Sequence, residues 1–179
     1  MRYAGMVTVQ IHPIGPGALV ALINGWGTSP REVGRREPPP SSTAPDAAGR
    51  RSSAELTAVA DRLYRVFATE DPIDRARLIN AMLADTTVRP AVREDGSLEP
   101  AWNVPRARDA LLASTALALR DHLAAYPDRL GLCADHQCAD VYVDASPGGH
   151  RRFCSLTCQN RARAAAYRLR HRTSKPAGA

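Results

Sequence analysis

All four cysteines of this 179-residue chain lie close together near its C-terminal end. They form two pairs, one at Cys133 and Cys138 and the other at Cys154 and Cys158. Zn²⁺ takes four soft ligands at the corners of a tetrahedron, and four thiolates complete that set without leaving a position for water or substrate. The spacing of the cysteines therefore predicts one structural zinc ion per chain, bound by all four residues.

Two other arrangements of these thiols compete with a metal site: a pair of disulfides, or four unrelated buried cysteines. Disulfides form in oxidising compartments, yet the N-terminal sequence MRYAGMVTVQIHPIG lacks the charged start, apolar run and cleavage site of a secretory signal. We therefore expect a cytoplasmic protein and a metal site. His136 and His150 could compete as ligands, but because four cysteines already complete the tetrahedron we expect both histidines on the surface.

The residues around the cysteines predict a knuckle, a hairpin and a helix, in that order. The first pair can turn inward from a tight knuckle. Residues 141–143 favour a strand, 146–149 a turn and 150–153 a returning strand. The second pair has the spacing that places two side chains on one face of a helix, which we expect to begin after Ser155 as its N-cap. This order is typical of a treble-clef zinc finger.

This stretch resembles the CGNR zinc finger, a bacterial module named for the tetrapeptide that begins at its last cysteine. Here residues 158–161 read Cys-Gln-Asn-Arg, with Gln159 where the family name has Gly. The resemblance extends to Tyr142, Asp144 and the lead at 151–155, and then to an arginine-rich helix. Gln favours a helix over Gly by about 0.5–1 kcal/mol, so we expect the fold to be kept.

The resemblance also bears on the rest of the chain. Members of the family usually carry an upstream helical region, called ABATE, that opens with an apolar run ending in Asn; Leu22-Ile23-Asn24 resembles that ending. Proteins of this kind are described as stress-induced transcription regulators. The resemblance therefore implies a DNA-binding zinc finger behind an N-terminal domain that senses a ligand or a protein partner.

Upstream of the cysteines the sequence predicts a mainly helical domain. The apolar run at 17–26 is too short to span a bilayer and should be a buried helix or strand, and no membrane partner is expected. Residues 28–51 are rich in Pro, Ser, Arg and Gly, which indicates a flexible loop. Helices are expected after Ser52, which forms a capping box with Glu55, after Asp71 and from Pro105, with short strands at 7–11 and in a hairpin around 94–96.

The predicted fold class is mainly α with a small hairpin (α+β). A helical ABATE-like domain should cover 1–128, a treble-clef-like four-cysteine zinc finger with a basic helix 129–173, and a disordered tail 174–179.

The upstream region has no nucleophile elbow, phosphate loop or paired acid and base, so we expect no enzyme activity. A small-molecule or protein effector site between the upstream helices stays open.

The basic residues are concentrated at the C-terminal end. The formal net charge is +6, from 24 Lys and Arg and 18 Asp and Glu. Eight of the basic residues follow Asp144, the last acidic residue, so the preceding part carries 16 basic residues against all 18 acidic ones. This asymmetry indicates that the C-terminal end alone meets a polyanion.

The helix expected to begin at Leu156 presents distinct surfaces when each residue advances by about 100 degrees. Cys158, Ala162, Ala165 and Leu169 share one side, which we expect to face the zinc ion and the hairpin. Arginines occupy both flanks of that side. One flank holds Arg161, Arg168 and Arg172, the other holds Arg163 and Arg170, and the outward face holds Asn160, Ala164, Tyr167 and His171.

This arrangement is typical of a helix in the major groove of DNA, with cationic flanks on phosphates and a central face toward the base edges. We therefore predict DNA as the partner, and expect Arg161, Arg168 and Arg172 to contact mainly phosphates. The main alternative is a zinc-braced module that binds an acidic protein. RNA is a third possibility, which is weakened because the helix lacks interleaved aromatic residues and Tyr167 stands alone in it. The candidate nucleic-acid-binding residues are Arg151, Arg152, Asn160, Arg161, Arg163, Tyr167, Arg168, Arg170, His171 and Arg172.

Asn160 has two interpretations. Its amide offers a donor and an acceptor side by side, which matches adenine in the major groove. Alternatively, it could hydrogen-bond the hairpin or the surroundings of the thiolates and stiffen the zinc site. The second account is favoured at this point, because residues beside zinc ligands commonly support those ligands.

Overall fold

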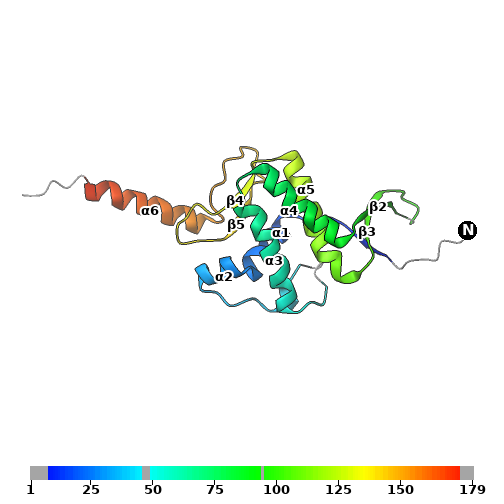
Figure 1. The fold of residues 1–179 in the computed structure, drawn as a ribbon. Coiled ribbons are helices and arrows are strands. Elements are labelled where there is room, and N and C mark those ends of the chain that lie inside the picture. Colours follow the sequence, from blue (N-terminus) through cyan, green and yellow to red (C-terminus); the bar gives the residue numbers. More distant parts are fainter. Residues whose placement is uncertain (1–7, 46–48, 94, 174–179) are drawn as a thin grey trace, which may run out of the picture.

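A computed structural model describes residues 8–45, 49–93 and 95–173, with the backbone alone at 172 and 173. The described chain is mainly helical with two small antiparallel sheets, which confirms the predicted α+β class (Figure 1). The tail expected at 174–179 lies outside the described residues. Among the helices that the structure describes, none is long and apolar enough to cross a membrane.

Five α-helices build the upstream body, and two of them begin at caps that the sequence predicts. Ser52 Oγ accepts a hydrogen bond from the N–H of Glu55, whose carboxylate in turn accepts one from the N–H of Ser52. The carboxylate of Asp71 caps the next helix by accepting from two backbone N–H groups. The five helices are α1 (Pro16–Trp26), α2 (Thr28–Gly34), α3 (Ser53–Ala68), α4 (Pro72–Thr86) and α5 (Ala110–Ala125), with 3₁₀ turns at Ser41–Thr43 and Ala107–Asp109.

Each sheet is small and antiparallel. The first has the order β1-β3-β2, in which β2 (Arg89–Val92) and β3 (Pro100–Val104) form the predicted hairpin and β1 (Val9–Ile11) covers the other side of β3. The second pairs β4 (Leu130–Leu132) with β5 (Val141–Val143). Because β4 ends just before Cys133 and β5 begins soon after Cys138, this second sheet brings both sides of the first cysteine pair together.

The structure differs from the sequence expectation at two places. Part of the segment expected as a loop forms α2, because the distant carboxylate of Asp61 accepts hydrogen bonds from the N–H and the hydroxyl of Thr28 at 2.6 and 2.7 Å and caps the helix. Residues 150–153 form no strand, because β5 takes β4 as its partner instead. A single backbone bond, from Ala134 N–H to the Arg152 carbonyl at 2.8 Å, ties that segment to the knuckle.

The main hydrophobic core joins the helical body to the second sheet. Its members come from α1, α3, α4 and α5, and also from β4 and β5. The boundary expected between residues 128 and 129 therefore falls inside a packed core. The largest buried members are Leu19, Leu22, Ile23, Trp26, Leu56, Leu63, Val66, Phe67, Ile79, Met82, Leu111, Leu112, Leu119, Leu130, Val141 and Val143.

The last helix, α6 (Leu156–Thr173), is arranged differently from the other five. It begins beside β4 and β5 and then projects away from the body (Figure 1). Cys158 is buried and Ala165 is half-buried, whereas Leu169, which the sequence places on the same side, has 66% of its surface exposed. The zinc finger is too small to cover more than the first half of the helix, so the expectation that Leu169 faces the hairpin is wrong.

Candidate metal centre

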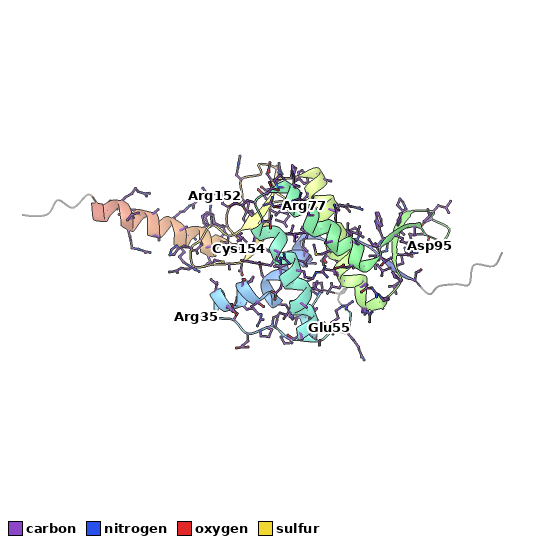
Figure 2. The ribbon with its side chains drawn as sticks, viewed as in Figure 1. Arg35, Glu55, Arg77, Asp95, Arg152 and Cys154 are labelled. Atoms are coloured by element: carbon purple, nitrogen blue, oxygen red, sulfur yellow. The ribbon has the colours of Figure 1, made fainter. Side chains whose placement is uncertain are left out.

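The four cysteines form one cluster at the junction between the body and α6, where Figure 2 labels Cys154. Their sulfur atoms all lie within 4.8 Å of one another. Cys154 Sγ lies 3.7 Å from Cys138 Sγ and 3.6 Å from Cys158 Sγ. A zinc tetrahedron with bonds of about 2.3 Å has sulfur–sulfur edges of about 3.8 Å, whereas a disulfide requires about 2.05 Å. The sulfurs therefore have the spacing of metal ligands.

Backbone hydrogen bonds shape the chain around this cluster. In the knuckle, Cys133 N–H donates to the Asp140 carbonyl at 2.8 Å and Cys138 N–H donates to the Asp135 carbonyl at 2.9 Å. At the start of α6, Ser155 Oγ accepts from Cys158 N–H at 3.3 Å, which confirms Ser155 as the N-cap. The knuckle thus presents the first two thiols, and the first turn of α6 presents the last.

Two backbone N–H groups also point at sulfur. Asp140 N–H donates to Cys138 Sγ and Cys154 N–H donates to Cys133 Sγ, both at 3.4 Å. Donors of this kind stabilise a thiolate more than a thiol. Such hydrogen bonds orient the ligands of a metal site and adjust their charge.

Burial opposes the ionisation of two thiols in this cluster. Burial raises the pKa of Cys138 to about 12, and burial together with the neighbouring sulfurs raises the pKa of Cys154 above its ordinary range. Burial acts on Cys133 as well, but the N–H groups of Cys154 and Asp135 outweigh it and lower the pKa of Cys133. A bound divalent cation supplies the positive charge that the thiolates need, so metal binding and loss of the thiol protons are coupled.

The helical body contacts the zinc finger through a side chain on α1. Asn24 Oδ1 accepts from Val141 N–H at 2.8 Å, and Asn24 Nδ2 donates to the Val141 carbonyl at 3.1 Å. The amide therefore pairs with both backbone groups of one β5 residue, as a neighbouring strand would. Asn24 thus joins α1 to β5.

A second contact joins α2 to the knuckle. The guanidinium of Arg36 forms an ion pair with Asp140, which lies between Cys138 and β5. Arg36 also donates to the Pro30 carbonyl at 3.0 Å, so its side chain folds back over the end of α2. A Cβ at Gly34 would lie 2.6 Å from Nε of Arg36, so a residue larger than Gly would displace that guanidinium.

A buried carboxylate lies under the knuckle. The side chain of Asp135 has 0% of its surface exposed, and its Oδ1 accepts from Gln137 N–H at 3.1 Å. Its Oδ2 lies 3.2 Å from Nη1 of Arg161 on α6, although no residue in the described part of the chain donates to Oδ2 with regular hydrogen-bond geometry. His136 Nδ1 lies 3.7 Å from Oδ1 at the surface.

Asp144 organises the loop that leads to the second cysteine pair. Its carboxylate accepts from the hydroxyl and N–H of Ser146 at 2.6 and 2.9 Å and from the N–H of Arg151 at 2.8 Å. The Ser146 hydroxyl, the Arg151 N–H and the Ser146 N–H lower the pKa of Asp144 to about 2. The acidic position that resembles the CGNR finger therefore has a structural role in this loop.

The structure places the predicted nucleic-acid-binding residues in two groups. In the first, Arg151 donates to the carbonyls of Phe153 and Cys154 at 3.0 and 2.5 Å, and half-buried Arg161 lies against Asp135. The side chain of Arg172 lies outside the described residues. The second group is exposed, and the rings of Tyr167 and His171 lie 4.2 Å apart within it. This group contains Arg152, Asn160, Arg163, Tyr167, Arg168, Arg170 and His171.

Neither interpretation of Asn160 gains a direct contact. Its side chain is exposed, and within the described residues it forms no hydrogen bond to the hairpin or to the thiolates. His136 and His150 are likewise exposed, and the metal-binding group found among the described residues consists of the four cysteines.

A polar cleft of about 770 Å³ separates α2 from the zinc finger and the first turns of α6. Arg35, which Figure 2 labels at the end of α2, forms part of one wall. Thr157 and Arg161 form part of the opposite wall, with Gln137 of the knuckle between them. Three of the four cysteines, Cys138, Cys154 and Cys158, also border the cleft.

Sequence analysis identified the ligands but missed the residues that support them. Asp135, Asp140 and Arg36 carry no recognisable motif, and their partners lie on other elements. Asp140 and Arg36 are 104 positions apart, so no local pattern could indicate their contact.

The comparisons with known proteins agree with the geometry. The family model of the CGNR zinc finger matches residues 129–171. This range includes all four cysteines, the whole second sheet and most of α6. No curated protein matches the chain. The C-terminal segment is thus similar to a CGNR zinc finger, and its four cysteines fit one structural zinc ion.

Proposed function

We propose that this protein binds DNA through α6 in a zinc-dependent manner. The observation that carries the proposal is the position of α6, which projects from the body with an exposed basic surface (Figure 1). From Leu156 to the end of the sequence the chain contains no Asp or Glu. A helix this basic, held away from an otherwise slightly acidic body, is suited to a polyanion.

The dimensions of α6 support DNA in particular. Its 18 residues span about 27 Å, and the major groove is about 12 Å wide, enough to admit one helix. Arg163 and Arg168 lie on opposite flanks, where the two phosphate backbones bordering the groove would run. Tyr167 and Asn160 lie on the outward face between them, toward the base edges.

The metal supports this role by holding the helix, and it supplies no chemistry of its own. Four thiolates leave no open coordination position for a substrate, so the proposed function is binding and not catalysis. The resemblance to transcription regulators suggests that the helical body acts as a sensing or interaction domain. Such a body would act on DNA binding through Asn24 and Arg36, which contact the zinc finger.

The test is binding of the zinc-loaded protein to labelled duplex DNA, followed by selection of bound sequences from a random pool. Each phosphate contact steepens the dependence of log K on log salt by about 0.9. Arg168→Ala should therefore weaken binding to all sequences and reduce the salt slope by about one. Arg77→Ala on α4 is the matched control, because Arg77 is an exposed arginine far from α6 (Figure 2).

One observation favours a different partner. Leu156 and Leu169 expose 75% and 66% of their surfaces, and contacts to phosphates do not use this apolar area. In this second candidate function, the zinc finger braces α6 against an acidic protein. If the pool yields no enriched sequence and Arg77→Ala weakens DNA retention as much as Arg168→Ala does, DNA binding through α6 is excluded and the protein partner is favoured.

A further inference from the structure

The buried carboxylate of Asp135 has an unusual environment. Its side chain is fully shielded from solvent, yet of its two oxygens only Oδ1 accepts a hydrogen bond of regular geometry from the described residues. Taking a carboxylate out of water costs several kcal/mol unless a cation and hydrogen bonds compensate it. Asp135 must therefore depend on a positive charge nearby.

Arg161 supplies that charge. Its Nη1 lies 3.2 Å from Asp135 Oδ2, and its side chain is only 38% exposed, unlike the solvent-facing arginines further along α6. The other cationic candidate in contact is His136, which lies 3.7 Å from the opposite oxygen and is 70% exposed. Arg161 is thus the close partner of a charge that the knuckle has buried.

The ion pair connects two elements that the metal also connects. Asp135 belongs to the knuckle between Cys133 and Cys138, and Arg161 lies three residues after Cys158 on α6. The first turns of α6 are consequently held at two points, one through the fourth ligand and one through Arg161. Two contacts fix the direction of a helix, whereas a single contact lets the helix rotate about that point.

We propose that the Asp135–Arg161 ion pair sets the direction in which α6 leaves the zinc finger. Arg161 is then a positioning residue and not a phosphate contact, in contrast to the role expected from its place on the helix flank. The consequence for DNA rests on the proposed function above, because a helix that pivots presents its outward face to the groove for only part of the time. The consequence for the direction of α6 does not depend on DNA.

Asp135→Asn separates the two roles, because they predict opposite signs. If Arg161 contacts phosphate, removing the neighbouring carboxylate frees the guanidinium and deletes a negative charge, so DNA binding becomes tighter. If the ion pair positions α6, the same change weakens binding. If α6 without the ion pair has the DNA-binding direction about a tenth of the time, the apparent Kd for DNA rises about tenfold.

Arg161→Ala gives a second distinction. A lost phosphate contact reduces the salt slope by about 0.9, as expected for Arg168→Ala, whereas a lost positioning residue weakens binding and leaves the slope unchanged. In the double variant Asp135→Asn/Arg161→Ala the two effects should not add, because each change breaks the same ion pair. Effects of opposite sign that add would overturn the proposal.

Backbone ¹⁵N relaxation of the zinc-loaded protein tests the positioning role without DNA. Amides at 162–168 should have order parameters near 0.85, as in a rigid helix, and these should fall toward 0.6 in Arg161→Ala and in Asp135→Asn but not in Arg168→Ala. Zinc content should stay at one ion per chain in all four proteins. Order parameters that stay unchanged in both ion-pair variants would overturn the proposal.

The two readouts keep separate failures apart. If the wild-type protein binds no DNA, the proposed function fails while the relaxation data still decide on the ion pair. If Asp135→Asn loses its zinc, Arg161→Lys takes its place: it keeps the charge but lacks the planar fork of Arg. We expect the order parameters of Arg161→Lys to lie between those of the wild-type protein and those of Arg161→Ala, because the charge is kept and the fork is lost. Order parameters as low as in Arg161→Ala would show that the charge of residue 161 does not hold α6 and would overturn the proposal.

Discussion

Asn24→Ala should destabilise the whole protein, because Asn24 joins α1 to the zinc finger. Its amide makes hydrogen bonds of 2.8 and 3.1 Å to the N–H and carbonyl of Val141, a residue with 0% of its surface exposed. A buried backbone group that loses its partner costs about 1–3 kcal/mol. Two such groups, less about 0.7 kcal/mol for the better helix propensity of Ala, give a loss of roughly 1–5 kcal/mol in the free energy of unfolding.

The assay is thermal and urea unfolding of the zinc-loaded protein. For a chain of this size a loss of 1 kcal/mol lowers the melting temperature by about 2–4 °C, so Asn24→Ala should lower it by roughly 2–20 °C. Asn80→Ala is the matched control, because Asn80 is an exposed asparagine inside α4 and its replacement should change the free energy by less than about 0.7 kcal/mol. Equal effects of the two substitutions would refute the junction role of Asn24.

Two further predictions concern the metal and pH. After chelation, hydrogen exchange should accelerate at 133–138 and 145–171, while Val141 and Val143 stay protected by the core; equal acceleration at Val141 would contradict this. Asp144→Asn should lower the melting temperature by an amount that is constant above about pH 5 and shrinks between about pH 4 and 2. The pKa of Asp144 is lowered from 3.8 to about 2, so its stabilisation is present above 3.8 and is lost as pH falls through 2; a difference that grows in acid would contradict the assignment.

The metal ligands and the helix starts were predictable because their signals are local. Paired cysteines determine a ligand set by spacing alone, and the caps at Ser52, Asp71 and Ser155 depend on residues within three positions. α2 was not predictable, because its N-terminus is capped by Asp61 from α3, 33 positions away. Local preference could not decide the strand partner of β5 either, since β4 and residues 150–153 lie at similar distances along the chain.

The role of Arg161 was unpredictable for a related reason. A helical wheel places it on a flank beside Arg168, where both look equivalent, and only the fold shows that a buried carboxylate faces one of them. Sequence periodicity gives the direction of a side chain around its helix and says nothing about what lies opposite. The same limit explains Leu169, whose apolar side matches Cys158 in direction but extends beyond the zinc finger.

These contacts indicate that the zinc finger has two parts with different sources of stability. Leu130, Val141 and Val143 are buried in the core of the helical body, and burial of each contributes about 1.5–3 kcal/mol independently of the metal. The knuckle, the loop after Asp144 and α6 bury little apolar surface and depend on the cysteine cluster. The boundary between body-dependent and metal-dependent structure therefore crosses the zinc finger after β5 and does not coincide with its first residue.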